Sequence, residues 1–178
     1  MSRMATTYEF GRRTGVCAAT GRPLVPGEHY VAALIEKKPE EGEGLLRADY
    51  SEDAWASSPR PEGLFAFWRT TADDSKSDGP KFIDDAALLE MFQQLDGATE
   101  PKRVAFRYVL ALLLIRKRLL VAAGQRRGVM LVQEKLSGPG SVAAQAKAPT
   151  IEVIDPALDA ETVEDVTRQL EAVIRVGA

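Results

Sequence analysis

Cys17 and His29 are the only thiol and the only imidazole in the chain. A cysteine beside a histidine can form an activated thiolate nucleophile, provided that the two side chains come within hydrogen-bonding distance and a third group orients the ring. These two residues lie twelve positions apart across a turn-rich stretch. Because an unpaired cysteine usually packs as a small apolar side chain, we favour a buried thiol and a surface histidine over a catalytic pair.

Carboxylates offer a second kind of chemistry, but their spacing does not suit acid–base catalysis. Asp73-Asp74 and Asp84-Asp85 are adjacent in sequence, and neighbouring side chains in a loop or a cap point apart. Asp84-Asp85 is better interpreted as the cap of a helix, and Asp49 and Asp53 could bind a metal only with further oxygen ligands. The sequence has no phosphate-binding glycine loop and no hydrolase motif. We therefore expect a protein that is not an enzyme and that uses no cofactor.

The stretch Cys17-Ala-Ala-Thr20-Gly21 resembles the knuckle of zinc-ribbon and treble-clef domains, in which Cys-x-x-Cys-Gly precedes a strand. Here Thr20 stands where the second cysteine would be. A structural zinc site takes four Cys or His ligands, and one chain with one cysteine and one histidine cannot supply them. The resemblance implies a degenerate knuckle without metal, in which Gly21 and Gly27 supply the positive φ angles of tight turns.

Charge is unevenly distributed along the chain, although the net charge is only −3. Residues 101–148 contain 10 Lys and Arg but 1 acidic residue, whereas residues 1–100 and 149–178 are net acidic. Five basic residues are the candidate partner-binding residues: Arg116, Lys117, Arg118, Arg126 and Arg127. We expect acidic neighbours to neutralise them within the protein, with Glu161, Glu164 and Asp165 as the obvious mates. The alternative is an exposed basic surface for an anionic partner.

These observations favour a non-enzymatic interaction or adaptor protein whose partner is an unknown protein or a second copy of the chain. The alternative is an RNA- or ribosome-associated factor that uses the basic segment 116–127. A single cysteine and an N-terminus without an apolar signal segment predict a cytoplasmic location. The uninterrupted apolar run from Tyr108 to Ile115 is much shorter than the roughly 20 residues of a membrane span, so we expect no membrane association.

A long apolar helix around residues 104–120 is the central element that the sequence predicts. Thr99 is its expected N-cap, Pro101 fits its first turn, and Gly124 is expected just beyond its end. Apolar residues cover most of its circumference, which is typical of a buried helix. A shorter amphipathic helix over residues 86–95, capped by Asp84-Asp85, should pack against it as an antiparallel hairpin.

The remaining patterns predict short strands and two further helices, and the fold class is α+β. Residues 29–36 and 45–50 read as a hairpin, Ser51 as the cap of a helical turn, and 63–70 as an aromatic strand that covers the core rather than stacking bases. Strands at 129–135 and 150–154 precede a last amphipathic helix capped by Asp159. We divide the chain, which could still be one domain, into segments: 1–82, a mainly β module; 83–136, the helical hairpin and a strand; 137–148, a mobile linker; 149–178, a strand and helix.

Overall fold

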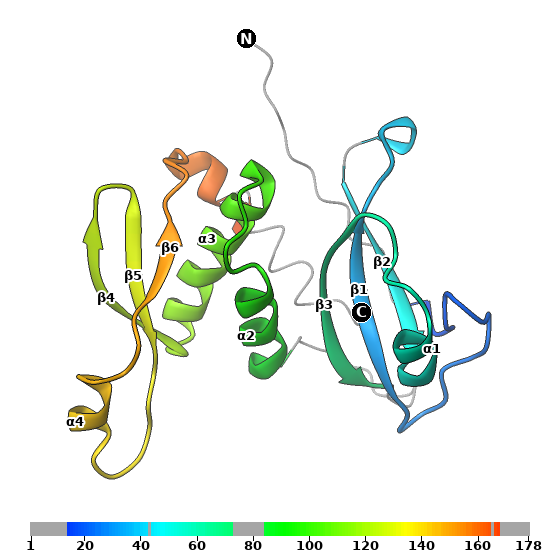
Figure 1. Ribbon diagram of the computed structural model, residues 1–178, viewed down its shortest axis with the longest axis horizontal. Coiled ribbons are helices and arrows are strands. Elements are labelled where there is room, and N and C mark those ends of the chain that lie inside the picture. The colour runs from blue at the N-terminus through cyan, green and yellow to red at the C-terminus, as the bar shows by residue number, and fades with distance from the viewer. Residues whose placement is uncertain (1–13, 43, 73–83, 165, 168–178) are drawn as a thin grey trace. The chain divides into compact units, whose positions relative to one another are not determined.

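A computed structural model describes residues 14–42, 44–72, 84–164 and 166–167 (Figure 1). The fold is α+β, as the sequence predicts, with two three-stranded sheets and several helices. The chain divides into two compact units, Met1–Met91 with Arg168–Ala178, and Phe92–Thr167. We call them unit 1 and unit 2. Within the described ranges, no helix has both the length and the apolar character needed to cross a membrane.

Unit 1 is built on an antiparallel sheet with the strand order β2-β1-β3 (Figure 1). Its strands are β1 (His29–Glu36), β2 (Leu45–Ser51) and β3 (Leu64–Thr71). A short 3-10 helix, η1 (Pro39–Glu41), lies between the first two strands, and helix α1 (Glu52–Ser57) follows β2. The central strand has five consecutive buried residues, Tyr30–Leu34, because it is paired on both edges and covered on both faces.

The aromatic residues of β3 belong to the core of unit 1, as the sequence predicts. Phe65 and Trp68 are 3% and 2% exposed. Phe67 packs on Trp55 with ring centroids 5.0 Å apart, and Tyr50 packs on the same tryptophan at 5.3 Å. These rings are therefore committed to packing rather than to stacking on bases.

Two predicted helix caps are present. Ser51 caps α1, because its Oγ accepts a hydrogen bond of 3.4 Å from the backbone N–H of Ala54. Asp84 caps α2 (Asp85–Gln94), because its Oδ1 accepts a hydrogen bond of 2.7 Å from the N–H of Ala87. In both cases a side-chain oxygen satisfies a backbone donor that the helix itself leaves unpaired.

Unit 2 consists of helix α3 (Pro101–Arg116) packed against an antiparallel sheet with the order β4-β5-β6 (Figure 1). The strands are β4 (Leu120–Arg126), β5 (Val129–Glu134) and β6 (Ile151–Ile154). The buried side of α3 includes Val109, Leu110 and Leu114, and each strand contributes a fully or almost fully buried residue: Leu120, Val132 and Val153. The prediction of a buried long helix is confirmed, and this packing is the core of the unit.

Helix α3 ends earlier than the sequence predicts, at Arg116 rather than near Gly124, and its N-cap is Glu100 rather than Thr99. Arg118 adopts a left-handed conformation with φ of 62°. The N–H of Leu119 donates to Leu114 O and that of Arg118 to Ile115 O, each at 2.9 Å. This is a Schellman ending, in which glycine is usual at the left-handed position. Because an arginine instead of a glycine occupies this position, the sequence does not show the usual glycine signal for a helix end.

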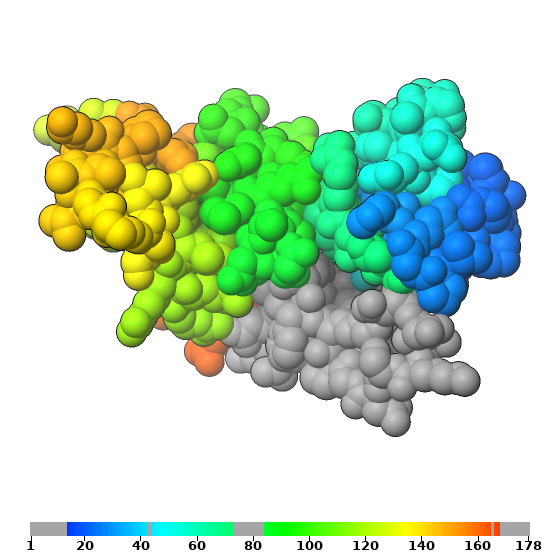
Figure 2. Space-filling view, turned by 90° about the horizontal axis from the view of Figure 1, so that it is seen from below, coloured from blue at the N-terminus to red at the C-terminus, as the bar shows by residue number. Residues whose placement is uncertain are grey.

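The segment predicted as a mobile linker, 137–148, contains helix α4 (Ser141–Gln145). The side-chain amide of Gln145 accepts a hydrogen bond from Leu136 N at 2.8 Å and donates one to Glu134 O at 3.0 Å. The segment lies at the surface in the space-filling view, where it is yellow to orange (Figure 2). It is therefore attached to β5 by side-chain bonds, and its mobility stays a prediction.

The C-terminal helix is described only from residue 160 to 167, without residue 165. Its predicted cap is present, because Asp159 Oδ1 accepts a hydrogen bond of 2.6 Å from Thr162 N. Most of the predicted apolar stripe of this helix lies outside the described residues.

Candidate functional site

The five basic residues predicted to bind a partner lie in two separate groups. Arg116 is the last residue of α3, and Lys117 and Arg118 form the turn after it. Arg126 ends β4, and Arg127 lies in the turn to β5. All five are exposed, but β4 separates the groups, and seven strand residues extend about 20 Å. The first group lies at the end of α3 and in the turn after it, not within a helix that reaches Gly124.

One of these residues already has a partner within unit 2. Arg126 forms an ion pair with the carboxylate of Glu152 on β6, across the central strand β5, and both side chains are more than half exposed. The predicted mates were acidic residues of the C-terminal helix, of which Asp165 lies outside the described residues. At the hairpin end of β4, a carboxylate of the same sheet neutralises part of the positive charge.

Cys17 and His29 contact different residues. Cys17 is fully buried, and its sulfur lies 3.6 Å from Ser51 Oγ and accepts a hydrogen bond of 3.4 Å from Ser51 N. Burial alone would raise the pKa of the Cys17 thiol, but hydrogen bonds from Thr20 and Ser51 outweigh it and lower the pKa to about 6. The ring nitrogen Nδ1 of His29 instead lies 3.0 Å from Thr71 Oγ1. The geometry does not support a nucleophile and base pair.

The segment Cys17–Gly21 forms a tight turn, and its resemblance to a zinc-ribbon knuckle stays a prediction. Gly21 N donates to Cys17 O at 2.7 Å, and Gly21 and Gly27 have φ angles of 69° and 82°. Across the described part of the chain, no group of three or more His, Cys, Asp and Glu side chains could hold a metal. Whether the purified protein contains zinc stays a question for metal analysis.

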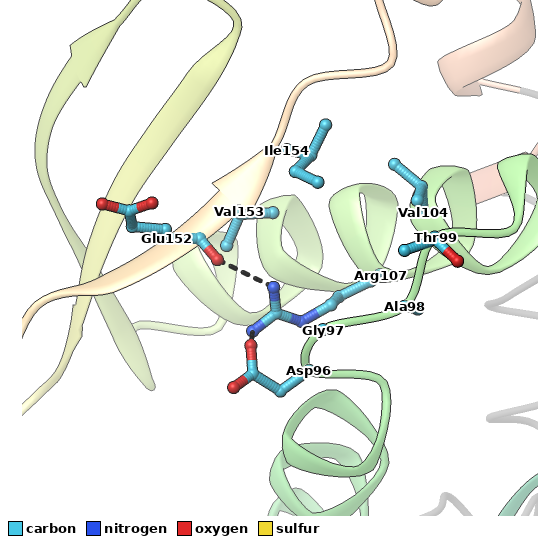
Figure 3. A pocket seen from close by; sticks show the side chains of 9 residues that line it. All are labelled: Asp96, Gly97, Ala98, Thr99, Val104, Arg107, Glu152, Val153 and Ile154. Atoms are coloured by element: carbon cyan, nitrogen blue, oxygen red, sulfur yellow. Dashed lines mark hydrogen bonds and ion pairs between the residues drawn. The ribbon is translucent and has the colours of Figure 1, made fainter.

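Unit 2 contains a cavity of about 250 Å³ beside the N-terminal half of α3 (Figure 3). The α2–α3 connection, α3 and strand β6 line it, with these residues: Asp96, Gly97, Ala98, Thr99, Val104, Arg107, Glu152, Val153 and Ile154. The wall is largely apolar, and the guanidinium of Arg107 reaches across it from the helix towards the strand. We call this the Arg107 pocket.

Arg107 joins three elements through its guanidinium. Its Nε donates to Phe92 O in the last turn of α2 at 3.3 Å, and its Nη1 donates to Glu152 O on β6 at 2.8 Å. Nη2 lies 2.7 Å from Asp96 Oδ1, and the guanidinium carbon lies 4.7 Å from the centre of the Phe92 ring. These contacts with described residues use three of the five N–H donors of an arginine, so the side chain has a structural role in joining α2, α3 and β6.

The electrostatics of the pocket are asymmetric. The Arg107 side chain is 7% exposed, whereas that of its counter-ion Asp96 is 70% exposed. Burial lowers the pKa of Arg107, and the charge of Asp96 partly offsets that effect. An arginine nevertheless stays protonated in proteins. The pocket therefore presents a fixed, desolvated positive charge whose own counter-ion lies in water and can be replaced.

Sequence reasoning did not identify this pocket. In the sequence, Arg107 is simply the charged residue that precedes the apolar run from Tyr108 to Ile115. The available signal was a single arginine in the predicted buried part of that helix, because a buried charge needs a partner. Nothing in the sequence indicates that the partners are Asp96 and the backbone of β6, which lies 45 residues further along the chain.

Comparison of the chain with protein-family models, with curated proteins and with solved structures found no match.

Proposed function

We propose that the protein is a non-enzymatic, cytoplasmic interaction module that binds a partner protein at the Arg107 pocket. The observation that carries the proposal is the buried guanidinium, which faces a cavity and is neutralised by an exposed carboxylate. Recognition sites commonly combine an apolar wall with a few well-placed polar groups. Arginine is also frequent among the residues that dominate binding energy.

Binding by the basic residues is less well supported. A single RNA contact would need Arg116, Lys117 and Arg118 to act together with Arg126 and Arg127, but the length of β4 separates the two groups. Arg126 also has a carboxylate partner in Glu152. The RNA- or ribosome-associated function therefore remains the alternative.

A peptide selection tests the proposed function. Random linear peptides would be selected on the full chain and then titrated against a variant with a filled pocket, Thr99→Trp. Thr99 is exposed and lines the pocket, so a large side chain there should block entry without disturbing the core. Gln125→Trp on the exposed part of β4 is the matched control.

We expect selected peptides to bind the wild type and Gln125→Trp equally, and Thr99→Trp at least about tenfold more weakly, as for the loss of a central contact. Peptides that bind all three proteins equally would place the binding surface elsewhere. A selection without enriched peptides would contradict the proposal.

A further inference from the structure

One edge of β6 faces the Arg107 pocket. Within the part of the chain that the structure describes, this strand pairs only with β5, with Val153 opposite Met130 and Ile154 opposite Val129. Backbone groups of a strand alternate between its two neighbours. Asp155 N donates to Gly128 O on the β5 side at 2.8 Å, and Glu152 O accepts from Arg107 on the opposite side. The N–H and C=O of Ile154 therefore point, like those of Glu152, to the pocket edge.

This edge is open at one end and closed at the other. Among the described residues, Ile154 has no backbone partner on the pocket side. At Glu152 the guanidinium of Arg107 already occupies the carbonyl. An added strand could thus pair with the backbone of Ile154 but could not continue past Glu152, because Arg107 stands in its path.

Charge determines which chain end can meet Arg107. A strand added antiparallel to β6 would pass Ile154 first and bring its C-terminal end to the guanidinium, whereas a parallel strand would arrive with its N-terminal end. Arg107 is positive, and the nearby first turn of α3 carries the positive end of the helix dipole. Both favour a carboxylate and disfavour an ammonium group.

We infer that the Arg107 pocket binds the C-terminal tail of a partner protein, which adds antiparallel to the edge of β6 and places its α-carboxylate on Arg107. The carboxylate takes over the position of Asp96, whose exposed side chain swings into solvent. Ile154, 50% exposed, and the half-buried Val104 provide an apolar surface for one side chain of the tail. The inference rests on the proposed function and adds the class of ligand to it.

The first test compares two synthetic libraries of acetylated random pentapeptides, one ending in a free carboxylate and one in a carboxamide. Both would be incubated with the full chain, and the retained peptides would be identified by mass spectrometry and titrated. We expect retained peptides to lose about ten- to a hundredfold in affinity when the carboxylate is amidated, as for hydrogen bonds to a charged group. Equal binding of acid and amide forms would overturn the inference.

Two pairs of variants separate the features of the site. Ile154→Pro removes the N–H that faces the pocket but no bond to β5, so it should weaken the binding of acid peptides by about two- to tenfold. Ile154→Val keeps the N–H and only trims the apolar surface, so it should weaken binding less than Ile154→Pro does. Asp96→Asn removes the competing counter-ion and should strengthen acid peptides by about two- to fivefold, without effect on amides. Glu90→Gln, which removes a partly exposed counter-ion elsewhere, that of Arg69, should change neither.

The results distinguish this inference from the proposed function. In one outcome, the selected peptides lose binding in Thr99→Trp and yet bind equally well as acids and as amides. That result would support the proposed function but refute the inference that the ligand is a C-terminal tail. Unchanged affinity of acid peptides for Asp96→Asn and Ile154→Pro would refute the binding geometry. If no peptide of either library depends on the pocket, both proposals fail.

Discussion

Arg47 in unit 1 and Arg107 in unit 2 both have almost fully buried side chains, and the two differ in where the counter-ion lies. The side chains of Arg47 in unit 1 and Arg107 in unit 2 are both 7% exposed. Asp49, the partner of Arg47, is 0% exposed, whereas Asp96, the partner of Arg107, is 70% exposed. The same residue type, equally buried, is thus enclosed in one unit and open to exchange in the other.

The ion pair of unit 1 is part of a closed network. Asp49 accepts from Arg47 Nε at 2.9 Å and from Thr14 N at 3.2 Å, while Arg47 also donates to Tyr30 Oη at 3.1 Å. The guanidinium carbon lies 5.4 Å from the centre of the Trp68 ring. These bonds join β1, β2 and the segment that contains Thr14. Burial of an arginine alone therefore does not indicate a binding site. The feature that distinguishes Arg107 from Arg47 is an exposed counter-ion beside a cavity.

The largest expected effect is the loss of the buried carboxylate. Asp49→Ala leaves Arg47 buried without its counter-ion, and removing one partner of a buried pair typically costs about 3–5 kcal/mol. Urea denaturation should show this loss, and Asp53→Ala, an exposed aspartate four residues on, should lie near the wild type. A stability of Asp49→Ala within about 1 kcal/mol of the wild type would mean that Arg47 reaches water and that the network of unit 1 is not closed.

Cys17 gives the second test of the closed character of unit 1. Its pKa is about 6 in the folded protein, below the roughly 8.5 of an unfolded cysteine. A depressed pKa stabilises the folded state fully above about pH 8.5, and this stabilisation is lost as the pH falls towards 6. The free energy of unfolding of the wild type, minus that of Cys17→Ala, should therefore rise between pH 6 and 8.5, by at most about 3 kcal/mol.

Thiolate absorbance at 240 nm offers an independent measurement for the same residue. A titration midpoint near 6 is expected for the folded protein. A midpoint near 8.5, with a difference in stability that does not vary with pH, would show that the bonds from Thr20 and Ser51 do not hold a thiolate.

The third prediction concerns the open pair of unit 2. Asp96→Ala should lower stability by no more than about 1 kcal/mol, because its carboxylate is largely exposed and Arg107 keeps its hydrogen bonds to the carbonyls of Phe92 and Glu152. Urea denaturation of Asp96→Ala and Asp49→Ala under the same conditions compares the free energy of unfolding that each variant loses. Equal losses in the two variants would contradict the idea that Asp96 is exchangeable, and with it the basis for a ligand carboxylate.

Local sequence patterns were sufficient for much of the fold. The strand over residues 29–36 has the bounds that its apolar pattern predicts, since turn residues flank it on both sides. The caps at Ser51, Asp84 and Asp159 were predictable because a capping side chain bonds to a backbone N–H only three residues away. Information of this kind is contained in a short stretch of chain.

The errors arise where distant residues decide the structure. Leu120–Arg126 contains residues that suit a helix, but it is a strand because it pairs with β5, and tertiary pairing overrides local propensity. The Arg107 pocket requires β6 to lie beside α3, which no short pattern specifies. The proximity of Arg118 and Arg126 in sequence was misleading for the same reason, because a strand between them holds them apart.

The smallest expected effect tests whether the basic hairpin end of β4 serves an external partner. Replacing both Arg126 and Arg127 by Glu turns the Arg126–Glu152 attraction into a repulsion, but both side chains are exposed, so the loss of stability should stay between about 0.5 and 1 kcal/mol. Lys135→Glu with Lys147→Glu is the control, since it changes the net charge equally at exposed positions.

If acidic residues of the protein itself neutralise Arg126 and Arg127, thermal denaturation should show a lower melting temperature for the arginine variant than for the control. The wild type should then not retain RNA at physiological salt. RNA binding by the wild type that weakens steeply with salt, and that only the arginine variant loses, would instead favour the nucleic-acid alternative, with the log-log slope falling by about one unit per lost phosphate contact. The binding site of unit 2 would then be the basic end of the β4–β5 hairpin, and the exposed counter-ion of Arg107 would not mark the binding site.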